Sequence, residues 1–283
     1  PRPEPDTAAR RMPPRASQLR QYRVLTQRYV DLLLQDRKNL TVLLLQAPLI
    51  AYLTTLVASH DSITAMRPTS YEAKIVLFMM ATVSAWFGVI NAAREIAKET
   101  AIFARERLAG VRIAAYLASK LSVLGALVAL QSGILLAVLG AKVAFPADGV
   151  RGSGPLELFV TTWLSGFAAL SLGLFISSAA RTTDRAISAI PVALVPQILF
   201  SGVLFPLGEE TSIMRILSWL TVSRWSTDAY AITVELTRFP DASKAAEYAY
   251  TADNLAEKWM ALGAHTSVYV LLAAVMLARR EQA

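Results

Sequence analysis

Long apolar stretches dominate the sequence and alternate with charged or polar segments. Six of the stretches are long enough to cross the roughly 30 Å hydrocarbon core of a bilayer as helices. They cover about residues 40–58, 75–93, 114–140, 156–178, 186–206 and 260–278. Buried helices of a soluble protein would need far more polar helix surface than the rest of the chain offers. The pattern therefore predicts an all-α integral membrane protein with six transmembrane helices.

Composition agrees with a membrane protein and narrows its chemistry. Hydrophobic residues make up 54% of the 283 residues, and charged residues only 17%. There is no cysteine, and the two histidines lie far apart in sequence, so no metal-ligand motif is present. Neither a phosphate-binding GxxxxGK[ST] loop nor a GxSxG or HExxH motif occurs. We therefore expect no catalytic site, metal or cofactor within this chain.

The distribution of lysine and arginine predicts the orientation of the chain. With both termini in the cytoplasm, the inside segments hold 19 of the 28 basic residues. Such an excess is typical of cytoplasmic loops. It also accounts for the net charge of +7 without a nucleic-acid partner. We therefore predict an N-in, C-in protein of the plasma membrane.

Two segments precede the first predicted span. Residues 1–15 are rich in Pro and Arg and predict a flexible linker, at which a longer polypeptide would join this chain. Residues 16–39 place apolar side chains at helical spacing opposite a basic face. This pattern predicts an amphipathic helix that lies along the inner membrane surface.

A charged segment separates the second and third predicted spans. Residues 94–109 predict a short cytoplasmic helix, supported by Glu95 and Lys98 one turn apart and ended by Gly110. Small residues recur on one face of this helix, at Ala97, Ala101, Ala104 and Leu108. The segment therefore has one contact face and one charged face. A solvated hairpin without a partner is the alternative.

Other segments carry weaker signals. Pro191 and Pro196 predict a bend in the fifth span, which either lines a cavity or is a packing kink. Small residues in the fourth span predict close helix packing, at Gly166, Ser171, Gly173 and Ser177. Residues 206–258 form the longest outside segment, whose first half is too polar to span but aromatic enough for the membrane interface.

Two sequence motifs, together with the order of the predicted spans, resemble those of a known family. Residues 99–110 carry the pattern E-x3-F-x-RE-x3-G, followed by Tyr116 and Lys120. "SGVLFPL" at 201–207 is followed by "ILSWLTVSRWSTDAYA" at 216–231. Together with the spans, these motifs resemble the transmembrane domain of ABC-2 or ABCG-like (type V) exporters over nearly the whole chain. The order of segments is similar to that of actinobacterial exporters in which forkhead-associated and nucleotide-binding domains precede the membrane domain.

The resemblance implies an organisation and a set of partners. Residues 16–39 would be the connecting helix, and 40–283 the ABC-2 type transmembrane domain with a coupling helix between spans two and three. The outer segment would include re-entrant helices before span six. The partners would be a nucleotide-binding domain upstream in the same polypeptide, a second copy of the chain and membrane lipid. ATP and Mg would bind only at the nucleotide-binding domain.

The resemblance also implies roles for particular residues. The residues that contact the nucleotide-binding domain would be Glu99, Phe103, Arg105, Glu106 and Gly110. The substrate cavity would be lined by Phe87, Leu194 and Ile198. An outer plug would be formed by Val203 and Leu204, where the family has a leucine pair.

Several functions remain open at this point. The first hypothesis is an ATP-driven half-transporter that acts as a dimer and exports a hydrophobic or amphipathic substrate such as a lipid, glycolipid or drug. A polysaccharide exporter of the same broad family is disfavoured by the long 206–258 segment. A membrane anchor without transport is a third possibility. A secondary carrier is disfavoured because every charge falls in a loop or at the end of a span.

Overall fold

A computed structural model describes residues 17–64, 70–204, 212–239 and 248–280. Its helices are α1 (Gln18–Gln35), α2 (Arg37–Val57), α3 (Tyr71–Ala92), η1 (Ala97–Glu99), α4 (Thr100–Leu108), α5 (Ile113–Gly140), α6 (Gly154–Ala179), α7 (Thr183–Leu199), α8 (Ile213–Ser218), α9 (Val222–Thr233), η2 (Leu236–Arg238) and α10 (Ala252–Arg279). No strand occurs among these residues. The expected all-helical class is therefore confirmed, while the predicted linker 1–15 lies outside the described residues.

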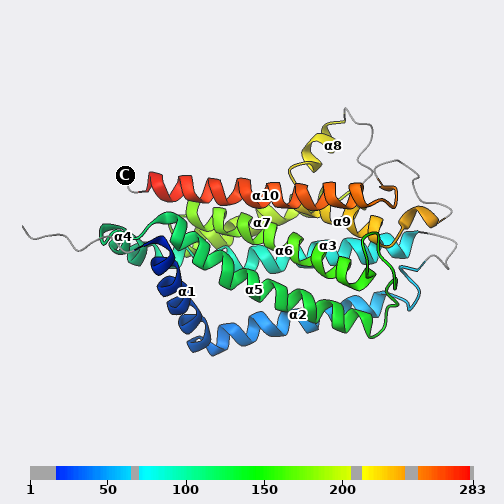
Figure 1. Cartoon of the computed structure of the whole chain (residues 1–283), viewed down its shortest axis with the longest axis horizontal. Coiled ribbons are helices and arrows are strands. Elements are labelled where there is room, and N and C mark those ends of the chain that lie inside the picture. The colour runs from blue at the N-terminus through cyan, green and yellow to red at the C-terminus, as the bar shows by residue number, and fades with distance from the viewer. Residues whose placement is uncertain (1–16, 65–69, 205–211, 240–247, 281–283) are drawn as a thin grey trace, which may run out of the picture.

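The long helices run side by side, and α1 crosses one end of the bundle (Figure 1). The central helix is α6, which packs most extensively against α3 and α10. α1 packs on α5 through Leu25 and Tyr29, both buried. α1 and the last turn of α10 lie at the same end of the bundle, which we call the hairpin end because α4 lies there too (Figure 1).

Five described helical segments are long and apolar enough to cross a membrane. They contain α2, α3, α5, α6 and α10. The sixth predicted span corresponds in part to α7, which has 17 residues and contains Pro191 and Pro196. α7 ends at Leu199, where the sequence pattern extended the span to 206, and residues 205 and 206 lie outside the described part.

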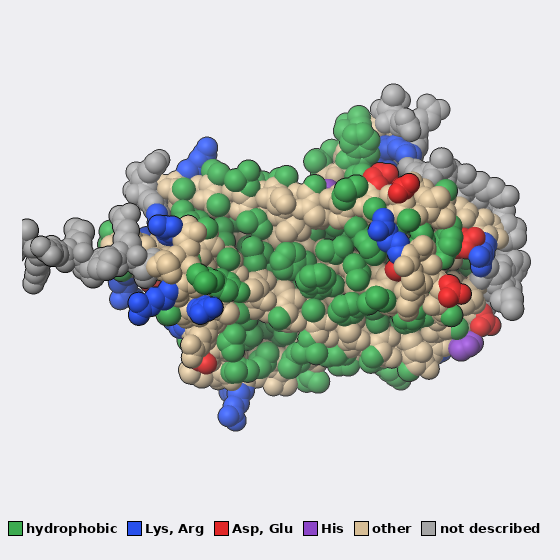
Figure 2. Space-filling model, viewed as in Figure 1, with side chains coloured by type: hydrophobic (Ala, Val, Ile, Leu, Met, Phe, Trp, Pro, Cys, Tyr) green, Lys and Arg blue, Asp and Glu red, His purple; other side chains and the backbone are tan. Residues whose placement is uncertain are grey.

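Charge divides along the long axis of the molecule. Lys and Arg side chains gather at the hairpin end, whereas acidic side chains on the visible face lie mostly at the other end (Figure 2). Apolar side chains cover the surface between the two ends (Figure 2). This arrangement is that of a protein whose middle lies in lipid.

Small residues permit the close approach of the central helices. A Cβ at Gly166 would lie 2.5 Å from Val128 Cγ1, and a Cβ at Gly173 would lie 2.9 Å from Val89 O. These two positions were expected to permit close packing, and the structure confirms it. Gly88 of α3 makes a still closer approach, because a Cβ there would lie 2.1 Å from Gly166 O.

The outer segment is more deeply embedded than its aromatic composition suggested. All residues of α9 except Trp225 are buried, against α3, α6 and α10. The hydroxyls of Ser226 and Thr227 donate to the helix's own backbone. The Ser223 hydroxyl instead donates to a carbonyl of α7, and the Tyr230 hydroxyl to a threonine of α6. Because these hydroxyls find hydrogen-bond partners within the protein, the semi-polar helix can be buried. Trp219, by contrast, is 55% exposed.

Candidate functional site

The charged segment between α3 and α5 is not the single helix that the sequence predicted over 94–109. The chain turns at residues 93–96, continues as η1, and becomes α-helical only at Thr100. Ser177 Oγ accepts hydrogen bonds from the backbone N–H groups of Ile96 and Ala97 at 2.9 and 3.0 Å. This hydroxyl satisfies two donors that the break would otherwise leave unpaired, so a residue of α6 stabilises the turn.

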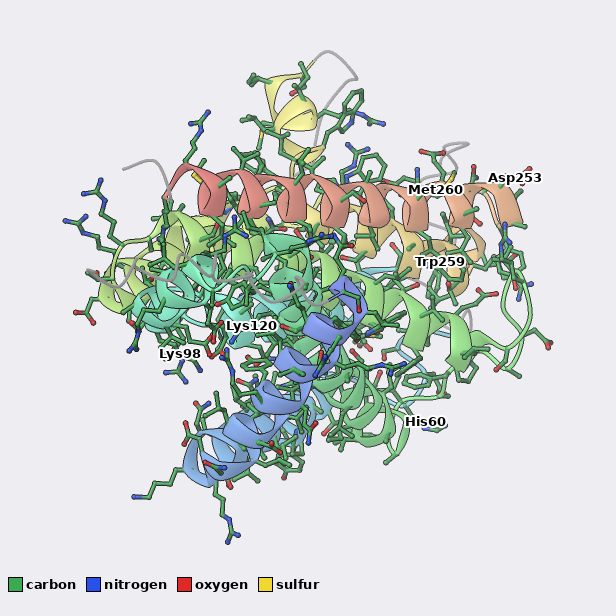
Figure 3. All side chains as sticks on the ribbon, turned by 60° about the vertical axis from the view of Figure 1, so that its left-hand side comes forward. His60, Lys98, Lys120, Asp253, Trp259 and Met260 are labelled. Carbon is green, nitrogen blue, oxygen red and sulfur yellow. The ribbon has the colours of Figure 1, made fainter. Side chains whose placement is uncertain are left out.

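The break directs a set of polar and aromatic side chains inward. We call them the hairpin cluster: Tyr29, Glu95, Glu99, Phe103, Tyr116 and Lys120, all buried. They come from α1, the turn, η1, α4 and α5, which are adjacent only in the folded chain. Lys120 lies near Lys98, away from His60, Asp253 and Trp259 (Figure 3).

Lys120 is the central cation of the hairpin cluster. Its Nζ lies 2.8 Å from Glu99 Oε1 and 3.6 Å from the centroid of the Tyr29 ring. The side chains of Lys120 and Glu99 are only 2% and 7% exposed. A buried pair of this kind is strongly coupled, because removing either partner leaves an uncompensated charge. Tyr116 donates a hydrogen bond to the other carboxylate oxygen, Glu99 Oε2, at 3.1 Å.

A second carboxylate extends the cluster towards α1. Tyr29 donates from its hydroxyl to Glu95 Oε2 at 2.5 Å, and Lys98 Nζ lies 2.7 Å from Glu95 Oε1. Burial, followed by the charge of Glu95, raises the pKa of Tyr29 well above its usual value. Tyr29 therefore remains a hydrogen-bond donor at neutral pH. The expected Glu95–Lys98 contact is confirmed.

Aromatic packing attaches α4 to the same cluster. The rings of Phe103 and Tyr116 are tilted, with their centroids 4.5 Å apart. Phe103 is buried in the apolar core at this end, together with Leu25 of α1 and Leu277 of α10. A third ion pair, between Arg28 and Glu106, joins α1 to α4. α4 is thus held at one face by three other helices.

The opposite face of α4 is open. Ala101, Ala104 and Arg105 are exposed, and Leu108 is 90% exposed. The predicted stripe of small residues therefore lies mostly outside the fold, and Phe103 alone supplies the buried anchor. Gly110 follows with φ of +91°, a conformation that favours glycine, and its carbonyl accepts from Gln21 Nε2 at 3.2 Å.

The three residues assigned to a substrate cavity are more buried than the exposed face of α4. Phe87 is 1% exposed and packs with Ala47 of α2 and Leu135 of α5. Leu194 is also buried, in a cluster with Ala169, and Ile198 is half-buried. Their contact with substrate stays a prediction.

The two residues assigned to the outer plug follow the end of α7. Val203 is half-buried and Leu204 is 50% exposed. Val203 lines a small cavity of about 170 Å³ together with Asp228 of α9. Leu204 is the last described residue before the gap at 205–211, and the plug stays a prediction.

Sequence reasoning missed a buried polar chain inside the bundle. Asn91 Nδ2 donates to Gln131 Oε1 at 2.7 Å, and Gln131 Nε2 donates to the Leu43 carbonyl at 2.7 Å. Gln46 Nε2 extends the chain by donating to Asn91 Oδ1 at 3.4 Å. The only available signal was the presence of amides within apolar stretches. The chain links α2, α3 and α5.

Replacing Asn91 by leucine should lower the free energy of unfolding by about 1–2 kcal/mol, because Gln131 loses its buried partner. Leucine at both Asn91 and Gln131 should cost less than the sum of the two single changes. Thermal unfolding of the four proteins in detergent measures this interaction energy. Strictly additive effects would mean that the two amides are independent.

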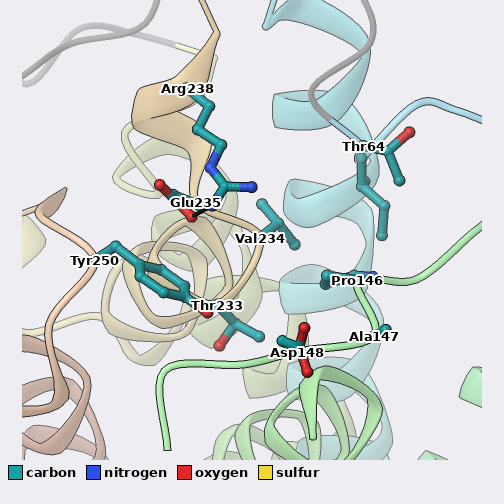
Figure 4. Close-up of a pocket in the computed structure, with 10 residues that line it drawn as sticks. Thr64, Pro146, Ala147, Asp148, Thr233, Val234, Glu235, Arg238 and Tyr250 are labelled. Atoms are coloured by element: carbon teal, nitrogen blue, oxygen red, sulfur yellow. Dashed lines mark ion pairs between the residues drawn. The ribbon is translucent and has the colours of Figure 1, made fainter. Parts of the chain in front are cut away.

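A separate cavity lies at the end of the molecule away from the hairpin. It has a volume of about 250 Å³ and is lined by residues including Asp148, Thr233, Glu235, Arg238 and Tyr250 (Figure 4). Arg238 Nη2 lies 2.6 Å from Glu235 Oε2. Glu235 adopts φ of +49°, which is uncommon for a residue other than glycine.

The apolar bundle with an embedded, ion-paired hairpin defines a multi-pass membrane protein in which one face of α4 is exposed. Comparison with known families agrees. Residues 20–234 match the ABC-2 type transporter family, and the chain belongs to that family. It is therefore the membrane domain of a transporter.

A curated relative extends the comparison. The chain is 29% identical over 229 residues to the ABC transporter ATP-binding/permease protein Rv1747 of Mycobacterium tuberculosis (strain ATCC 25618 / H37Rv). The match covers 79% of this chain and 26% of that protein. The chain thus spans about a quarter of the length of this relative, whose printed name combines an ATP-binding part with a permease.

Proposed function

We propose that this chain is the transmembrane domain of an ATP-driven exporter that works as a dimer. α4 is its coupling helix, and α1 its connecting helix. The observation that supports this most directly is the division of α4 into a face held by the hairpin cluster and a face that is open. A helix that is anchored on one side and exposed on the other can transmit the motion of a partner to the spans.

The partner in this proposal is a nucleotide-binding domain, which would bind ATP and Mg. The permease relative combines an ATP-binding part with its membrane part, which supports such a partner. Closure of two nucleotide-binding domains would bring two α4 helices together and switch the spans between inward and outward access. With α7 as a sixth span, both termini would lie in the cytoplasm and the protein in the plasma membrane.

The substrate in this proposal is hydrophobic or amphipathic, such as a lipid, glycolipid or drug. The side chains assigned to the cavity are apolar: Phe87, Leu194 and Ile198. Apolar side chains recognise apolar substrate surface and offer no hydrogen bonds to a polar head group.

Changing Leu108 to serine should lower both ATP turnover and export, by about fivefold or more if α4 docks on the nucleotide-binding domain. Leu108 is 90% exposed, so its loss should leave the fold unaffected. The measurement is ATP hydrolysis and lipid export by the full-length protein in vesicles. Leu156→Ser is the matched control, because Leu156 is 61% exposed at the opposite end of the bundle. Equal activity of Leu108→Ser and the control would refute the docking role.

A further inference from the structure

A second feature of the hairpin end is a basic pocket of about 580 Å³. It lies where α6 and α10 end and α4 begins. Its lining includes Thr100, Ser178, Arg181, Met276, Arg279 and Arg280. This basic pocket lies apart from the hairpin cluster, with which it shares no residue.

The basic pocket carries three guanidinium groups, and its lining holds no described carboxylate. Arg280 is held in place, because Nη1 donates to Thr100 Oγ1 at 3.2 Å and Nη2 donates to the Ala180 carbonyl. Burial lowers the pKa of Arg280 from its usual value, and the charge of Arg181 acts in the same direction. The positive charge in the pocket is therefore not neutralised by its own lining.

Arg181 and Arg279 provide the accessible charge. Both are exposed, and neither makes a side-chain hydrogen bond or ion pair with a described residue. Two exposed guanidinium groups beside one that is held in place can approach an anion from several directions. Arginine suits phosphate in particular, because its planar fork donates two parallel hydrogen bonds to two oxygens.

The basic pocket lies at the ends of two helices that could cross the membrane. α6 and α10 are both candidates to cross the membrane, and they end at Ala179 and Arg279. Met276 lies one helical turn before Arg279 and Arg280 and adds an apolar side chain to the lining. A bound phosphate at the arginines would therefore have apolar surface on its membrane side.

We propose that the basic pocket binds the phosphate group of an anionic phospholipid from the leaflet at the hairpin end. Basic pockets between membrane helices on the cytoplasmic side suit anionic head groups, and each basic residue near the surface strengthens such binding. A soluble phosphate would share the polar contacts but not the contact with Met276. A protein partner would need a carboxylate or a phosphorylated side chain that reaches the same three arginines.

Native mass spectrometry of the purified chain tests this proposal. Retention of phosphatidylglycerol is compared with that of phosphatidylcholine of identical acyl chains. Changing Arg181 and Arg279 together to glutamine should reduce the preference for phosphatidylglycerol by roughly tenfold. Arg20→Gln with Arg23→Gln is the matched control, because it removes the same charge from exposed positions of α1 and should change the preference less than twofold. Equal melting temperatures of the three proteins exclude a folding defect.

Two results would overturn the proposal. The first is an unchanged lipid preference in the Arg181/Arg279 double variant. The second is full displacement of phosphatidylglycerol by glycerol 1-phosphate at comparable concentration, which would indicate a soluble anion site. If the first result is accompanied by loss of ATP turnover in the full-length double variant, the pocket is a protein-docking site instead. None of these results depends on whether the chain exports a substrate.

Discussion

Replacing Glu99 by alanine is expected to lower the free energy of unfolding by about 3–5 kcal/mol, because Lys120 would remain as a buried cation without its carboxylate. Tyr116 would lose its acceptor at the same time. Thermal unfolding in detergent micelles, monitored by tryptophan fluorescence, measures the loss. A change of this size is a large fraction of the roughly 5–15 kcal/mol that stabilises an ordinary protein.

Two further variants test whether the cost of Glu99→Ala comes from leaving a charge buried or simply from losing an ion pair. Arg238→Ala removes the pair with Glu235, whose two side chains are 62% and 21% exposed. A pair at the surface contributes about 0–1 kcal/mol, so this variant should be close to wild type. Glu99→Gln combined with Lys120→Met removes both charges and should recover most of the stability. Equal costs for Glu99→Ala and Arg238→Ala would contradict the account of a buried, interdependent pair.

The second large effect is expected at Gly88. A methyl group there would lie 2.1 Å from Gly166 O and 2.5 Å from Leu170 N, both backbone atoms that cannot rotate away. Gly88→Ala should therefore push α3 from α6 and cost about 1–3 kcal/mol or more. Expression yield and thermal unfolding of the purified chain measure this effect.

Gly263→Ala provides the control for Gly88→Ala. Gly263 lies inside α10, and no atom lies within 4 Å of the position of its missing Cβ. Alanine favours a helix interior over glycine by about 1 kcal/mol, so this variant should be as stable as wild type or slightly more stable. If both variants behave alike, the contact between α3 and α6 does not depend on glycine.

The helices of this fold could be predicted where they depend only on residues close together in the sequence. Long apolar stretches and helix-ending residues specify where helices occur, because a membrane helix must satisfy its own backbone. The Glu95–Lys98 pair was predictable for the same reason, since both partners lie within one turn. α7 was overestimated in length because the apolar pattern continues past Leu199, where the helix ends.

Contacts between distant segments could not be predicted from local patterns. The break at 93–96 depends on Ser177, which lies about eighty residues later in the chain. The Asn91–Gln131 contact needs α3 and α5 to meet in one register, and the approach at Gly88 needs α6. The resemblance to a family identified Glu99 and Phe103 as a site, but only the structure pairs them with Lys120 and Tyr116.

The hydrogen bonds of Ser177 have a mechanical consequence. The turn at 93–96 separates α3 from α4, so the two do not form one continuous helix. A movement of α4 along its axis would therefore not be transmitted directly to α3. The same turn is tied to α6 by Ser177, and Arg280 ties Thr100 to the Ala180 carbonyl at the end of α6. In the proposed coupling, a displacement of α4 would therefore reach α6 first, and α6 would move together with its neighbours α3 and α10.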